Sequence, residues 1–329
     1  MTLQREHVHF CCLSCGGEID LSRQYSEDEQ VRQCASCGRQ YSVVNGVTRF
    51  VNTDAYTSSF GFQWNTFSKV QLDSYNRTNY SEQRFLDITG WTADDLRGKQ
   101  VLDAGCGAGR FAEITARKYG ALLHAIDLSS AVEACHVNLA GTEAVVSQAS
   151  IYELPFAPAT FDYVYCIGVI QHTPDPIKSI RALCKMVRPG GQIGLWIYAL
   201  TWKSLVGTSG FKYLLRPFVK RLAREKQIAF CHGLVDALYP LLFAAKHGGL
   251  LGKVIMRLSP VASSYLQHID LTPEDFRTWM FLDTFDMYTP AFDQPQRFET
   301  VVRVLAEEGF VDVRRHPHDG VAVTATRRQ

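Results

Sequence analysis

The amino-acid sequence predicts an α/β protein built on a doubly wound, mostly parallel β-sheet. An apolar run ends in Asp103 and is followed by glycine at every second position over 105–109. A second apolar run, residues 121–126, ends in another acid, Asp127. Strand-like apolar segments then alternate with amphipathic segments as far as residue 198, which is the pattern of repeated βαβ units. Such sheets bind ligands at the carboxyl ends of their strands, where both acids and the glycines fall.

The turn that contains Gly105, Gly107 and Gly109 is a candidate ligand cradle. Glycine lets the backbone turn sharply and lets a ligand lie directly against it. A dinucleotide fold uses the spacing G-x-G-x-x-G and aims amides at a pyrophosphate. The spacing here is G-x-G-x-G, and the carboxylate of Asp103 opposes a phosphate. These residues favour an uncharged or cationic ligand, with a dinucleotide as the alternative.

The segment 103–109 resembles the glycine-rich motif of class I S-adenosylmethionine-dependent methyltransferases, whose usual form is an acid followed by G-x-G-x-G. Three later features resemble the same family: Leu-Pro-Phe at 154–156, Gln-His-Thr-Pro-Asp-Pro at 171–176, and Arg-Pro-Gly-Gly at 188–191. The resemblance covers about residues 60–326. It implies a seven-stranded sheet, S-adenosylmethionine as cofactor, and methyl transfer to an O, N or C nucleophile.

The resemblance also implies roles for single residues. Asp127 suits the ribose hydroxyls, although an acid at a helix N-terminus is the plainer interpretation. Ser150 stands where the family usually has an Asp that accepts a hydrogen bond from adenine. Arg84 precedes the glycines at a place that suits the cofactor carboxylate, and residues 61–64 resemble a G-x-Q-W stretch of cofactor-capping helices. The predicted cofactor-binding residues are Asp103, Gly105, Gly107, Gly109, Asp127, Leu128, Ser150, Ile151, Gly168 and Arg84.

His172 is the predicted catalytic residue, because the turn after the fourth strand borders the reaction centre in this family. An imidazole suits proton transfer near neutral pH. The alternative is that His172 orients the turn through the Asp175 carboxylate.

Two cysteine pairs near the N-terminus predict a structural zinc ribbon. Cys12 and Cys15, and then Cys34 and Cys37, form C-x2-C knuckles that lead into glycine, a spacing that suits tetrahedral Zn²⁺. Cys11 is an alternative to Cys12, and His7 and His9 lie nearby. Unliganded thiols and a redox C-x2-C pair are the competing interpretations. The ribbon resembles a module found before some methyltransferase domains and suggests docking of a carrier or partner protein.

The predicted organisation has five parts. They are a zinc ribbon (1–50), a linker with cofactor-capping helices (51–98), the cofactor-binding core (99–198), a mainly helical lid and acceptor insertion after strand five (199–293), and a C-terminal helix with the last strands (294–329).

The insertion is basic. Between residues 199 and 260, ten Lys and Arg face two acids, a local charge of +8. A solvated surface, an anionic acceptor and a peripheral membrane contact each explain that charge. Asp286 and Tyr288, in the acidic aromatic segment that follows, are candidate acceptor contacts.

Composition limits the function classes. The 329 residues carry a formal charge of +1, which argues against nucleic acid as a partner. The N-terminus lacks an apolar signal core, and no charge-free apolar run approaches the length of a transmembrane helix, so we expect a cytoplasmic protein. We expect a small-molecule biosynthetic acceptor. The rival is an RNA base methyltransferase that uses the zinc ribbon for recognition.

Overall fold

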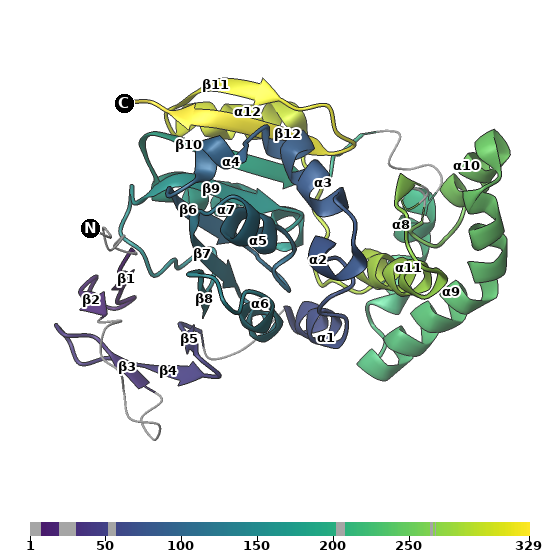
Figure 1. The fold of residues 1–329 in the computed structure, drawn as a ribbon, viewed down its shortest axis with the longest axis horizontal. Coiled ribbons are helices and arrows are strands. Elements are labelled where there is room, and N and C mark those ends of the chain that lie inside the picture. The colour runs from purple at the N-terminus through teal and green to yellow at the C-terminus, as the bar shows by residue number, and fades with distance from the viewer. Residues whose placement is uncertain (1–7, 20–30, 52–56, 202–207, 264–265, 267) are drawn as a thin grey trace.

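The computed structural model describes the chain except residues 1–7, 20–30, 52–56, 202–207, 264–265 and 267. Its centre is a ten-stranded sheet with helices on both faces (Figure 1). The strands lie in the order β11-β12-β10-β9-β6-β7-β8-β5-β4-β3. Their bounds are β3 Val31–Gln33, β4 Gln40–Val44, β5 Val47–Arg49, β6 Gln100–Ala104, β7 Leu122–Asp127, β8 Val145–Gln148, β9 Phe161–Ile167, β10 Val187–Ile197, β11 Phe310–Arg315 and β12 Val321–Arg327.

Seven of these strands, β6 to β12, form the doubly wound sheet that the sequence predicts. β6 pairs in parallel with β7 on one side and with β9 on the other, so the strand order reverses at β6. β12 runs antiparallel to β10 and β11, as predicted for the last strand. Ligands of open α/β sheets bind where the strand order reverses. One boundary differs from the prediction, because β10 begins at Val187 and a register shift between Val187 and Gln192 takes up the expected Arg-Pro-Gly-Gly turn.

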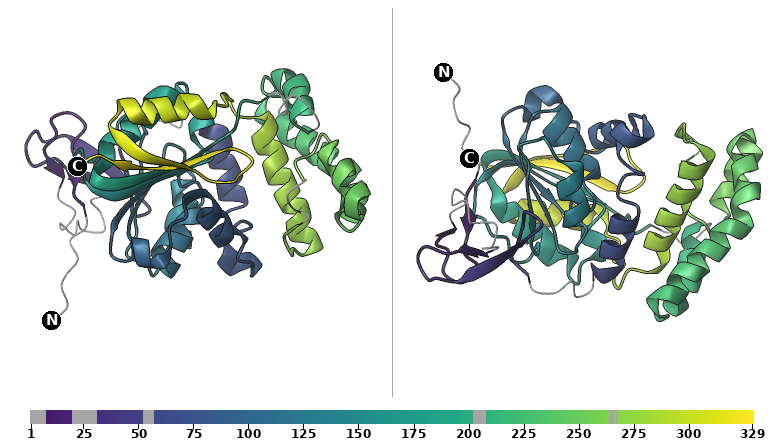
Figure 2. Two further views of the ribbon diagram at one scale, coloured as in Figure 1. Left: turned by 90° about the horizontal axis from the view of Figure 1, so that it is seen from above. Right: turned by 60° about the horizontal axis from the view of Figure 1, so that its bottom comes forward.

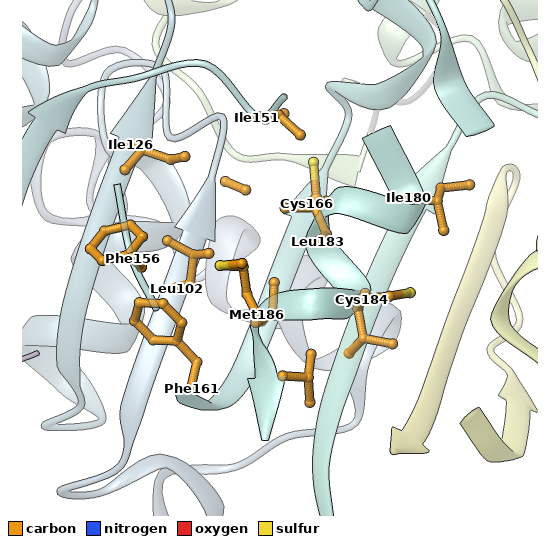
Figure 3. Packing of buried hydrophobic residues seen from close by; sticks show 14 of the residues in the cluster. Leu102, Ile126, Ile151, Phe156, Phe161, Cys166, Ile180, Leu183, Cys184 and Met186 are labelled. Carbon is orange, nitrogen blue, oxygen red and sulfur yellow. The ribbon is translucent and has the colours of Figure 1, made fainter. Parts of the chain in front are cut away.

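Helices cover both faces of the sheet, as Figure 2 shows from above. Parallel strands covered in this way are buried on both sides, so neighbouring Val101 and Leu102 both have no exposed surface. Figure 3 shows one of the two apolar layers, where Leu102 and Phe161 lie close to Leu183 and Met186 of α7. The covering helices are α3 (Tyr80–Thr89), α5 (Arg110–Glu113) and α6 (Val132–Asn138) on one face, and α7 (Pro176–Met186) and α12 (Phe298–Glu307) on the other.

The N-terminal segment extends the sheet. An Asn45-Gly46 turn with positive φ at both residues joins β4 to β5, as expected for a tight hairpin. β5 then pairs in parallel with β8. The buried guanidinium of Arg49 reinforces this contact, because it donates to Gln148 Oε1 at 3.1 Å and to Glu133 Oε1 at 2.7 Å. A separate hairpin, β1 (Phe10–Cys11) and β2 (Glu18–Ile19), lies beside it.

The insertion after β10 is helical and has its own apolar core. Its four long helices are α8 (Thr208–Val219), α9 (Arg224–Lys246), α10 (Gly249–Arg257) and α11 (Pro273–Tyr288). In Figures 1 and 2, α11 lies between the sheet and α9. By length and composition alone, α9 is apolar enough to cross a membrane, although the sequence analysis expected no such segment. One such helix is weak evidence, and α9 buries Cys231, Val235 and Leu242 in the core of the insertion.

Candidate functional site

The glycine turn after β6 is the centre of the candidate site. Gly105 and Gly109 have φ values of +89° and +94°, which residues other than glycine rarely adopt. The amides of Gly105 and Cys106 both donate to the carbonyl of Ile126, at 2.7 and 2.9 Å, and thereby hold the turn against β7. A Cβ at Gly105 would lie 2.4 Å from a methyl of Val169. Glycine at this position therefore allows the turn to approach the segment after β9.

Asp103 is buried at the mouth of this turn, with 3% of its surface exposed. Burial raises the pKa of its carboxyl to about 8, and a hydrogen bond from the Tyr165 hydroxyl opposes that shift. Its Oδ2 has no hydrogen-bond partner among the described residues. A buried acid with one unpartnered oxygen favours a cationic ligand over a phosphate.

Asp127 connects the glycine turn to the segment before α6. Its Oδ2 accepts from the Gly107 amide at 2.9 Å, and its Oδ1 accepts from the amide and hydroxyl of Ser129 at 2.8 and 2.7 Å. Oδ1 thus already accepts two hydrogen bonds, so a ligand hydroxyl would bind at Oδ2. The Ser129 hydroxyl thus serves Asp127, and α6 begins after Ala131 without a side-chain cap.

Four more predicted cofactor residues lie near the carboxyl ends of β7, β8 and β9. Leu128 accepts a hydrogen bond on its carbonyl from Gln148 Nε2 at 2.8 Å. The Ser150 hydroxyl accepts from the Tyr152 amide at 3.2 Å, and Ile151 is buried in the apolar layer. Gly168, with φ +78°, donates its amide to Trp196 at 2.9 Å.

Helix α1 (Ser58–Thr66) lies over the glycine turn. A Cβ at Gly107 would come within 3.3 Å of the Trp64 indole nitrogen. Asn65 Nδ2 donates to the Ser130 carbonyl at 3.1 Å and attaches the helix to the segment after β7. The predicted capping segment therefore contacts the candidate site.

Two arginines approach this region, of which the sequence analysis named one. The guanidinium of Arg84 lies 4.5 Å from the centre of the Trp196 ring. Arg110, which directly follows Gly109, donates to Ser81 Oγ at 3.0 Å, and its Nη2 is buried without a partner among the described residues. Burial lowers the pKa of Arg110 to about 10. Its place beside the glycine turn was the available sequence signal, and we add Arg110 to the candidate carboxylate-binding residues.

His172 ends a 3₁₀ turn, Ile170–His172, at the carboxyl end of β9. Its Nδ1 lies 3.0 Å from the carbonyl oxygen of Phe292, which accepts a hydrogen bond only from a protonated nitrogen. This contact selects the tautomer whose lone pair is on Nε2. Nε2 has no hydrogen-bond partner among the described residues and lies 3.9 Å from Asp286 Oδ2. The ring is therefore oriented as a proton acceptor.

The alternative role of His172 is wrong in its stated form. Asp175 caps α7 by accepting from the Lys178 amide at 3.0 Å, and no described contact joins it to His172. Of the two candidate acceptor residues, Asp286 reaches the site, where it accepts from the Tyr198 hydroxyl at 3.0 Å. Tyr288 does not, because it is buried in the core of the insertion and donates to the Pro260 carbonyl.

Further ionisable residues lie near Asp286 and Tyr198. Asp283 lies one turn before Asp286 on α11, and burial raises the pKa of its carboxyl to about 8. Lys212 of α8 is buried, pairs with Asp293 at 2.7 Å, and lies 4.8 Å from the Tyr198 ring centre. The insertion thus contributes both acids and a cation to the acceptor side.

The four predicted cysteines converge into one candidate metal centre. Their Sγ atoms all lie within 4.8 Å of one another, with Cys12 and Cys37, and Cys15 and Cys34, 3.6 Å apart. Four sulfurs at 2.3 Å from a tetrahedral ion are about 3.8 Å apart. Cys11 does not belong to the cluster, and His9 pairs with Glu18 at 2.9 Å. His7 lies outside the described residues.

Comparisons with known proteins find similarity to methyltransferases. Residues 102–195 match the family described as "Methyltransferase domain". The ubiquinone biosynthesis O-methyltransferase of Paracidovorax citrulli is 38% identical over 113 residues, which covers 32% of this chain and 44% of that protein. The enzyme of the same name from Pseudomonas fluorescens is 33% identical over 142 residues, covering 37% of this chain and 61% of that protein. The match therefore spans about half the length of these relatives.

Solved structures also align with the chain, among them one that covers most of it. Phosphoethanolamine N-methyltransferase 2 of Haemonchus contortus, in complex with S-adenosyl-L-methionine, is 18% identical, with a TM-score of 0.42. The alignment covers 80% of this chain and 46% of that one. We draw no functional argument from a similarity at this level.

The buried carboxyl of Asp103 predicts a pH-dependent stability. A folded-state pKa of about 8, above the unfolded value of 3.8, means that the folded state retains the proton more tightly. Its contribution to stability is complete below about pH 4 and is lost as pH rises to about 8. The free energy of unfolding of Asp103→Asn, measured in urea, should therefore rise relative to that of the wild type as pH increases. We expect the difference between the two proteins to change by about 2 to 4 kcal/mol from pH 5 to pH 8.5. If the free energies of unfolding of the two proteins changed with pH in the same way, the raised pKa of Asp103 would be contradicted.

Proposed function

We propose that the chain, whose residues 102–195 match a methyltransferase domain, transfers a methyl group from S-adenosylmethionine to a hydroxyl oxygen of a small-molecule biosynthetic acceptor. The observation that carries this proposal is the geometry of His172. Its Nε2 is free to accept a proton, and the Asp286 carboxylate lies 3.9 Å away. The names of the O-methyltransferase relatives support oxygen as the nucleophile.

The residues at the carboxyl ends of β6 and β7 fit such a cofactor. Bound there, S-adenosylmethionine supplies a methyl group that its sulfonium activates. The unpartnered Oδ2 of Asp103 is a buried acceptor for a cationic group, and the glycine turn leaves room for close approach of a ligand. Asp127 offers a carboxylate oxygen to a ribose hydroxyl, and Arg110 Nη2 offers a donor to the carboxylate. Both buried charges would gain a partner.

The remaining residues act on the acceptor. His172 Nε2 would take the hydroxyl proton as the oxygen forms its bond to the methyl carbon and the methyl–sulfur bond breaks, its electron pair remaining on the sulfur of the departing neutral thioether. The negative charge of Asp286 would stabilise the resulting imidazolium. The Phe292 carbonyl retains the Nδ1 proton throughout. Tyr198 orients Asp286 by donating to Oδ2. The rest of the rate acceleration would come from aligning the acceptor oxygen with the methyl group and from excluding water from the site.

We also propose that Cys12, Cys15, Cys34 and Cys37 hold one structural Zn²⁺. The tetrahedral spacing of their sulfurs supports it. The ion would stabilise a segment whose described strands are only two to five residues long. The relatives reported above are named for small-molecule methylation and lend no support to an RNA base methyltransferase.

Removal of the ribose acid should weaken cofactor binding. We expect Asp127→Ala to raise the Kd for S-adenosylmethionine about tenfold or more in calorimetry, because hydroxyl partners are lost. Glu133→Ala, on the neighbouring α6, is the control and should bind normally. An unchanged Kd in a folded Asp127→Ala protein would remove Asp127 from the cofactor site.

Removal of the imidazole should slow catalysis without affecting the cofactor. For His172→Ala we expect kcat to fall about 10²- to 10⁴-fold while the cofactor Kd stays within twofold. The kcat of Asp286→Asn should fall less, because the asparagine side chain can still accept the hydrogen bond from Tyr198. His136→Ala, an exposed histidine on α6, should retain full activity. Full activity of His172→Ala on a hydroxylated acceptor would refute the general-base role.

Metal removal should unfold the ribbon. We expect a chelator to release about one zinc per chain, measured with a metallochromic dye, and to increase hydrogen exchange over residues 8–19 and 31–44. Cys15→Ser should abolish zinc binding, while Cys11→Ser should retain it, because Cys11 lies outside the cluster. A metal-free protein that stays protected over these residues would contradict the proposal.

A further inference from the structure

The insertion exposes an unusual amount of apolar surface. Of the fourteen large hydrophobic side chains that are exposed in the described residues, eleven fall between residues 200 and 258. Leu250 and Leu251 of α10 are 80% and 70% exposed, and Leu214 and Phe218 of α8 are 63% and 69% exposed. Scattered single residues of this kind are ordinary, but a concentration in one substructure indicates an interaction surface.

These side chains form stripes on two helices. On α8 the stripe is Phe211, Leu214 and Phe218, at helical spacing, and Val219 is buried on the other side. On α10 it is Leu250, Leu251 and Val254, continued by Leu258 just after the helix, and Met256 faces the core of the insertion. The spacing of three and four residues places each stripe on one side of its helix.

The two stripes belong to the same outer part of the molecule. The Thr208 hydroxyl at the start of α8 donates to the Arg257 carbonyl at the end of α10, at 3.0 Å. In both views of Figure 2, α9 and the helices beside it form the edge farthest from the sheet. The insertion that carries both stripes therefore extends to the edge of the molecule away from the sheet.

Basic residues border the stripes. Among the described residues between 200 and 258, six Lys and Arg and two acids are exposed, which gives this surface a charge of +4. One of the two acids, Asp236, is paired with Arg277. On α10, Lys253 and Arg257 each precede an apolar stripe residue. The six are Lys220, Arg221, Arg224, Lys226, Lys253 and Arg257.

The buried cations of the insertion are already occupied. Lys212 pairs with Asp293, and Arg216 donates to the Pro290 carbonyl. Lys212 has an acidic partner, whereas Arg216 has a carbonyl partner and an Nε without one among the described residues. Both side chains are buried, so neither accounts for the exposed cations. An anionic lipid surface matches both the apolar stripes and the basic borders in one arrangement.

We propose that α8 and α10 bind the surface of an anionic lipid membrane, with their leucine and phenylalanine stripes in the acyl boundary and the flanking Lys and Arg at the headgroups. The stripe of α8 and Lys212, which lies over Tyr198 near His172, lie on different sides of this one helix. The acceptor side of the site is thus about one helix diameter, roughly 10 Å, from the lipid. Membrane binding itself goes beyond the proposed methyl transfer and does not require it.

The test is flotation of the full-length, zinc-loaded protein with vesicles. We expect the protein to float with vesicles of equal phosphatidylglycerol and phosphatidylcholine, and to bind vesicles of phosphatidylcholine alone at least tenfold more weakly. Leu250→Asp/Leu251→Asp should reduce binding to the anionic vesicles about tenfold or more, and Lys253→Glu/Arg257→Glu should do the same. Added salt should weaken wild-type binding.

Matched controls lie on the α/β domain. Val137→Asp changes an exposed valine of α6, and Lys185→Glu changes an exposed lysine of α7. Both should bind vesicles like the wild type, and all four variants should keep the wild-type Kd for S-adenosylmethionine. Failure of the wild-type protein to bind S-adenosylmethionine would count against the proposed function and not against the membrane surface.

Three outcomes would overturn the proposal. The first is absence of binding to anionic vesicles, and the second is equal loss in the α/β-domain controls. The third is a dimer in light scattering that Leu250→Asp/Leu251→Asp dissociates, which would show that the stripes pair with a second copy of the chain.

Discussion

The structure depends on the sharp turn between β6 and α5. The Ile126 carbonyl holds two amides of this turn, Asp127 accepts from a third, and Gly105 has no room for a Cβ beside Val169. These contacts join three consecutive parts of the sheet, β6, β7 and the segment after β9. They also determine where a ligand can lie, because the turn leaves backbone exposed only at the carboxyl ends of the strands.

A buried acid and a buried base at this turn each keep an atom without a partner among the described residues, which is unfavourable without a ligand. Asp103 has an unpartnered oxygen, and burial raises its pKa; Arg110 retains an unpartnered nitrogen on the other side of the glycines. A protein that served only as a scaffold would gain stability from apolar residues at both places. Unpaired groups of opposite charge beside one loop are instead what a zwitterionic ligand with a cationic centre requires. The fold therefore gives up some stability for a site that a bound ligand completes.

The insertion has two surfaces with different roles. Its inner surface contributes Asp286, Lys212 and Asp293 around His172, and its outer surface carries the apolar and basic stripes. The cysteine cluster is at the other end of the sheet, where β5 extends it beside β8. The cofactor domain is thus flanked by one segment that a metal would stabilise and one that contacts the acceptor.

The local patterns in the sequence determined the doubly wound sheet, the glycine turn and the four cysteines, because each rests on spacing within a few residues. Buried strands are apolar, a tight turn requires glycine, and a metal knuckle needs two thiols three positions apart. The partners of His172 were different. Its Nδ1 partner is the backbone of Phe292, and its neighbouring carboxylate comes from α11, not from nearby Asp175. Only the tertiary structure decided these contacts, because the path of the insertion back to the sheet depends on the packing of its own core and not on any motif.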